Sequence, residues 1–125
     1  MNDKKQIEYW LNGATEDLKT AELLVQNNRL LHGLFWCHLS IEKIMKAHVV
    51  RCTSEIPPKT HNLIWLLDKT DLQLSVKHIN LLGELMIYQL EGRYPDRYPK
   101  PPGKNIADDI LELTKDLYQW LVKKF

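Results

Sequence analysis

Two arginines and two tyrosines lie close together in a proline-rich segment, residues 91–103, and these side chains could bind a phosphate and a base. The segment contains the sequence Arg-Tyr-Pro twice, four residues apart, and four of the six prolines in the chain. A guanidinium is a planar fork of donors that suits phosphate, and a tyrosine ring is a stacking face. The candidate ligand-binding residues are Arg93, Tyr94, Asp96, Arg97, Tyr98 and Lys100.

The alternative for this segment is a structural role, in which Arg93 pairs with an acidic residue and the tyrosines pack the loop onto the rest of the protein. A loop of this length is uncommon in a small domain unless it has a function. Because the net charge of the chain is only +1, binding of nucleic acid would have to depend on a local patch.

A second group of charged residues follows helical spacing. His38, Glu42 and Lys46 are four residues apart and would share one face of a helix. In the functional interpretation Glu42 orients a loop arginine or a ligand, and in the structural one it forms an ordinary salt bridge. The candidate supporting residues are His38, Glu42, Lys43, Lys46 and His61, the last of which is expected at a helix start.

The sequence lacks the patterns of several other kinds of site. No two histidines have the spacing of a zinc site, and Cys37 and Cys52 would lie about 22 Å apart on one helix. The glycines form no phosphate-binding loop, and no serine has the surroundings of a hydrolase nucleophile. We therefore expect no metal, no cofactor and no disulfide.

Helices must position these residues, because the prolines fall in two places and every other stretch has apolar residues at helical spacing. The predicted helices span about 3–27, 30–51, a short stretch after 60, 74–90 and 104–124. The expected caps are Asp3 with Gln6, Thr60, and Asn105 with Asp108. No segment alternates like a strand, so the predicted fold is all-α: an up-down four-helix bundle with an additional short helix, forming one domain over residues 1–125.

Four motifs, in this order, resemble those of the HEPN domain family (higher eukaryotes and prokaryotes nucleotide-binding). They are Trp10 to Ala21 in the first helix, Ile41 to Ala47, Lys59 to Leu63, and Tyr88 followed by Arg93-Tyr94-Pro95-Asp96. The last motif resembles an Arg-Tyr-Pro branch of the family. The resemblance implies an all-helical homodimer that binds nucleotide or RNA and is often encoded beside a minimal nucleotidyltransferase, sometimes as a toxin–antitoxin pair.

Many proteins of that family are metal-independent ribonucleases, whose centre is an arginine followed four to six residues later by a histidine. No histidine follows Arg93 or Arg97 in this chain, and such catalysis needs an imidazole for proton transfer. The resemblance therefore carries over no catalytic residue, and Arg93 carries over only as a phosphate contact.

Three functions follow from these observations. The first is a protein that is not an enzyme, binds nucleotide or RNA phosphate through residues 91–103 and works with a nucleotidyltransferase in a toxin–antitoxin-like pair. The second is a non-catalytic protein-interaction module. The third is a ribonuclease with an atypical site built from Arg93, Tyr94 and His38 or Glu42.

Assembly and location can also be predicted. The apolar arc of the first two helices is wider than one core face requires, because it also includes Tyr9, Trp10, Trp36 and Leu39. The extra apolar surface predicts a self-complementary patch and therefore a homodimer. The apolar runs are too short for a membrane span, and the first residues lack the apolar segment of a secretory signal. We therefore expect a cytoplasmic protein with no membrane contact.

Overall fold

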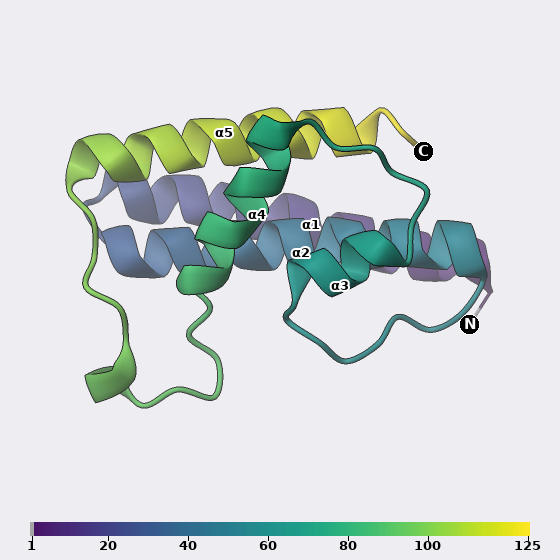
Figure 1. Ribbon diagram of the computed structural model, residues 1–125, viewed down its shortest axis with the longest axis horizontal. Coiled ribbons are helices and arrows are strands. Elements are labelled where there is room, and N and C mark those ends of the chain that lie inside the picture. The colour runs from purple at the N-terminus through teal and green to yellow at the C-terminus, as the bar shows by residue number, and fades with distance from the viewer. Residues whose placement is uncertain (1) are drawn as a thin grey trace.

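The computed structural model describes residues 2–125, which form five α-helices, one 3₁₀ turn and no β-strand (Figure 1). The elements are α1 (Asp3–Gln26), α2 (Leu30–Thr53), α3 (Leu63–Asp68), α4 (Val76–Ile87), η1 (Pro95–Arg97) and α5 (Lys104–Val122). The predicted all-α bundle with four longer helices and one short helix is confirmed. No helix in this range has both the length and the apolar character needed to cross a membrane.

Helix α2 lies at the centre of the bundle. In Figure 1, α1 and α2 are antiparallel, α5 runs in the direction of α2, and α4 crosses the others obliquely. All four other helices contact α2, and fourteen of its 24 residues are buried. Because α2 is covered on several sides, its buried residues extend beyond the single stripe that helical periodicity predicts, to Cys37, Ile44 and His48 among others.

The close packing of α1 on α2 depends on a glycine. A Cβ added to Gly33 would lie 2.5 Å from Cγ2 of Val25 and 3.1 Å from the Val25 backbone nitrogen, so a larger residue would push the helices apart. The hydroxyl of Ser40 donates to the carbonyl oxygen of Ala14 at 2.9 Å. The helices are joined at the predicted turn, where Asn28 adopts a φ of 62°, a conformation that asparagine tolerates.

The predicted helix caps are wrong, although the predicted helices are present. Asn2 rather than Asp3 caps α1, and Asn62 rather than Thr60 caps α3; each accepts from the backbone N–H three residues later, at 2.8 Å and 3.1 Å. Helix α5 begins after Gly103, which has no capping side chain. Neighbouring residues compete for the same free N–H groups, so pattern alone places a cap only to within one or two residues.

His48 ties the C-terminal end of α5 to α2. Its buried ring donates from Nε2 to the carbonyl oxygen of Leu121 at 2.8 Å and accepts at Nδ1 from Nε–H of Arg51 at 2.9 Å. The ring also stacks on Phe125, with 3.9 Å between the centroids. These contacts use both nitrogens of the neutral ring, and burial lowers the pKa of His48 to about 4.

We therefore expect the free energy of unfolding to decrease as the pH falls from about 6.5 to about 4. In the unfolded chain His48 takes up a proton below its ordinary pKa of 6.5, whereas the folded protein resists this until its lowered pKa is reached. The unfolded state binds more protons in this window, and the difference between the two pKa values corresponds to about 3 kcal/mol. Urea titrations at about pH 7 and about pH 4.5 check this. His48→Gln, which keeps a donor and an acceptor, should lose less stability than the wild type; equal losses would contradict the assignment.

Candidate functional site

The segment that connects α4 to α5 extends beyond the body of the bundle before it returns to α5 (Figure 1). It contains the short turn η1, so it is not entirely irregular. Tyr94 is 78% exposed, whereas Tyr98 is half-buried and its ring meets that of His32, on α2, edge-on at 6.4 Å. The other predicted ligand-binding residues are all exposed: Arg93, Asp96, Arg97 and Lys100.

The two arginines of the repeated motif differ in their contacts. Nη1 of Arg93 donates to the carbonyl oxygens of Ile87 and Gln89, at 3.2 Å and 2.9 Å. These carbonyls lie at the C-terminal end of α4, where backbone acceptors lack helical partners. Arg97 has no side-chain hydrogen bond within residues 2–125, and neither guanidinium has a carboxylate within 4.0 Å in that range. Both arginines therefore retain free donors that face solvent.

Glu42 is the centre of a buried polar network. Its side chain is 6% exposed, and its Oε2 accepts from Nζ of Lys46 at 3.1 Å. Its Oε1 accepts from Nδ1 of His61 at 2.8 Å and lies 3.8 Å from Nδ1 of His38. The ammonium group of Lys46 also lies over the ring of Trp10, 5.2 Å from its centroid. A buried carboxylate is tolerated only with such compensation.

His38 positions the backbone of His61. Nε2 of His38 donates to the carbonyl oxygen of His61 at 3.0 Å, which places the ring proton on that nitrogen. Nδ1 of His38 is buried and has no hydrogen-bond partner within residues 2–125. Burial lowers the pKa of His38, although the nearby Glu42 opposes this, so the ring is neutral at pH 7. His38 therefore supports the site from inside.

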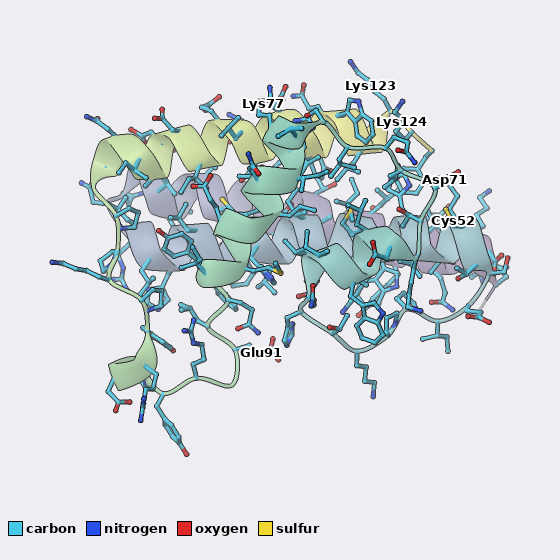
Figure 2. The ribbon with its side chains drawn as sticks, in the orientation of Figure 1. Cys52, Asp71, Lys77, Glu91, Lys123 and Lys124 are labelled. Carbon is cyan, nitrogen blue, oxygen red and sulfur yellow. The ribbon has the colours of Figure 1, made fainter. Side chains whose placement is uncertain are left out.

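His61 connects this network to the loop. Its second ring nitrogen, Nε2, lies 3.5 Å from Oε2 of Glu91. Figure 2 shows Glu91 on the side of the loop that faces the segment leading into α3. The side chains of His61 and Arg93 line one cavity of about 510 Å³, which brings together the two groups of candidate residues that are far apart in the sequence. The cavity is lined by His61, Asn62, Met86, Ile87, Gln89 and Arg93.

One of the predicted supporting residues does not join this site. Lys43 pairs with Asp17 of α1 at 2.8 Å. Conversely, the sequence did not identify Glu91 or Gln89 as parts of the site. No spacing rule relates Glu91 to His61, and Gln89 contributes a backbone carbonyl, which has no signature in the sequence.

At this cavity the guanidinium of Arg93 and the imidazole of His61 line the same surface. Because the ionised Glu42 can only accept, His61 donates to it from Nδ1, and Nε2 is the nitrogen that faces the cavity. That nitrogen accepts when the ring is neutral and donates when it is protonated. Together with the guanidinium of Arg93, it suits an anionic oxygen. No group of three His, Cys, Asp or Glu side chains in the described part of the chain could hold a metal ion.

The fold is shared with two crystal structures. TT1696 from Thermus thermophilus matches with a TM-score of 0.80 and 21% identity, over 100% of both chains. ST0689, an archaeal HEPN homologue, matches with a TM-score of 0.72 and 19% identity, over 94% of this chain and 96% of that one. At these identities the likeness concerns the fold alone.

The sequence itself matches no curated protein. It does match the model of the HEPN domain over residues 7–125, which includes all four motifs and both groups of site residues. This chain therefore belongs to the HEPN domain family.

Proposed function

We propose that this HEPN protein binds the phosphates of a nucleotide or of single-stranded RNA through residues 91–103, and that it does so without being an enzyme. The observation that supports the proposal is that the two loop arginines have free donors. Arg93 and Arg97 are exposed, lack carboxylate partners within residues 2–125, and Arg93 lies at the cavity. Free guanidinium donors beside a hollow are what a phosphate requires.

The exposed aromatic ring favours nucleic acid over a simple anion. Tyr94 is 78% exposed and follows Arg93 directly, so a base could stack on the ring while its phosphate reaches the guanidinium. Stacking of this kind requires bases that are not already paired. A nucleotide or a single strand therefore suits the site better than a duplex does.

A fluorescence anisotropy titration with a labelled single-stranded RNA tests this proposal. We expect the affinity to decrease as the salt concentration rises. The slope of log affinity against log salt should be only about −1.5, because about two phosphates are neutralised. The matching duplex should bind more weakly, and adenosine monophosphate should compete. A constant anisotropy at low salt, or binding that salt does not weaken, would reject the proposal.

A second candidate function is a metal-independent ribonuclease, because His61 and Arg93 line the same cavity although no histidine follows the arginine in sequence. Their side chains supply an imidazole for proton transfer and a guanidinium for the phosphate. The RNA recovered from the titration distinguishes the two candidates on a denaturing gel. Intact RNA supports binding alone, and cleavage in the presence of a metal chelator supports the ribonuclease.

The proposal includes two partners. A homodimer would use the exposed side of α1 and α2, where Tyr9 is 62% exposed and borders a shallow cavity of about 360 Å³. Trp36 of the predicted patch packs partly against the core, so Tyr9 and Trp10 would dominate the contact. A nucleotidyltransferase encoded nearby would be the second partner, in a toxin–antitoxin-like pair located in the cytoplasm. The mass of the particle in sedimentation, with and without the co-expressed neighbour, checks both; a 14.8 kDa species in each case would exclude them.

As a pure protein-interaction module, the chain would present the same loop to an acidic protein surface. The exposure of Ile87, at 53%, next to this loop is compatible with that function. The RNA titration separates the two, because an interaction module would leave the RNA unbound.

A further inference from the structure

The imidazole of His61 has carboxylates at both of its nitrogens. Nδ1 donates to the buried Glu42 at 2.8 Å, and Nε2 lies 3.5 Å from the carboxylate of Glu91. The two contacts differ in kind. Glu42 is 6% exposed and is held by Lys46, whereas the side chain of Glu91 is 60% exposed and belongs to the loop. The first contact fixes the ring, and the second occupies the face that looks into the cavity.

The charges around His61 come from two parts of the fold. From α2 they are the carboxylate of Glu42, the ammonium of Lys46 and the neutral ring of His38. From the loop they are Glu91 and Arg93. Since Lys46 already balances Glu42, the groups whose charge remains open to a ligand are Arg93, Glu91 and the ring of His61 itself.

We propose that His61 and Arg93 together form the phosphate-binding pair of this site, and that the carboxylate of Glu91 takes the place of the phosphate when no ligand is bound. This inference rests on the proposed binding of nucleotide or RNA and adds to it a second ligand residue and an internal competitor. A phosphate oxygen would receive Nε2–H of the protonated His61 and an N–H of Arg93, while Glu91 turns away.

The geometry allows this exchange. A contact of 3.5 Å between exposed groups is weak, so a phosphate with two cationic donors competes with it effectively. The side chain of Glu91 is 60% exposed, so it can turn into solvent. This movement need not displace Arg93, whose guanidinium is held by the carbonyl oxygens of Ile87 and Gln89.

The decisive experiment is a double-mutant cycle on the affinity for labelled single-stranded RNA. Glu91→Gln removes the competing charge and should tighten binding by about two- to fivefold. Glu84→Gln removes an equal charge from the exposed face of α4 and should have a much smaller effect. If the two variants tighten binding equally, the gain is due to net charge alone and the competition is refuted.

The second arm of the cycle uses His61→Gln. In that background Glu91→Gln should no longer tighten binding, because the group for which Glu91 competes is absent. An undiminished gain would overturn the role of His61. Melting temperatures of the variants establish that each one is folded, and Glu91→Gln against Glu84→Gln remains informative even if His61→Gln is unstable.

Failure of the proposed function itself looks different from failure of this inference, because then neither the wild type nor Glu91→Gln binds RNA.

Discussion

Replacing Glu42 with alanine is expected to lower the free energy of unfolding by about 3–5 kcal/mol, the cost of leaving a buried ion pair without one partner. Lys46 would keep its charge in a position where its side chain is only 9% exposed. His61 would lose its 2.8 Å acceptor as well. For a chain of 125 residues this corresponds to a decrease in melting temperature of about 12–20 °C, measurable by calorimetry or by urea titration.

Two further variants test whether the buried charge is the cause. Glu16→Ala removes an exposed carboxylate that pairs with Lys19 at 3.4 Å, and it should change stability by less than about 0.5 kcal/mol. Adding Lys46→Met to Glu42→Ala removes the stranded charge and should recover part of the loss. If Glu42→Ala proves as mild as Glu16→Ala, the network is not a major source of stability.

Replacing Arg93 with alanine is expected to weaken the binding of single-stranded RNA by about 10- to 100-fold. A hydrogen bond between charged partners contributes about 1.5–3 kcal/mol, and Arg93 is both the arginine at the cavity and the one positioned by the end of α4. The slope of log affinity against log salt should decrease in magnitude by about 0.7, because one phosphate contact is lost. Anisotropy titrations at several salt concentrations measure both quantities.

The controls separate positioning from charge. Arg93→Lys keeps the charge but loses the planar guanidinium, in which Nη1 holds two carbonyl oxygens while the other nitrogens stay free for a phosphate, so an intermediate affinity is expected. Lys19→Ala removes an exposed positive charge from α1 and should leave binding nearly unchanged. Equal losses for Arg93→Ala and Lys19→Ala would show that the binding is a diffuse effect of charge.

Much of the fold could be predicted because prolines and helical periodicity act locally. The prolines mark where helices must end, and apolar spacing marks the face that each helix buries. Periodicity predicts least about α2, where four neighbouring helices cover the helix and residues such as Ile44 and His48 are buried outside a single helical stripe. Which partners surround a helix is a property of the tertiary structure, and no local pattern contains it.

In the site, too, local contacts could be predicted and long-range contacts could not. The pairing of Glu42 with Lys46 followed from their spacing on one helix. The contacts of His61 with Glu42 and with Glu91 span 19 and 30 residues, and chain spacing could not predict them. Lys43 is predicted to support the site from its position on the same helix, but it pairs instead with Asp17 on another helix and lies outside the site.

The Arg-Tyr-Pro segment is held at both of its ends, by Arg93 on the carbonyl oxygens of Ile87 and Gln89 and by the ring of Tyr98 against His32. A segment secured in this way loses little freedom when a partner arrives. The proposed binding of a strand should therefore be one rapid encounter, without a slow folding phase. The lifetime of the complex, more than the speed of its formation, would then determine which sequences it prefers.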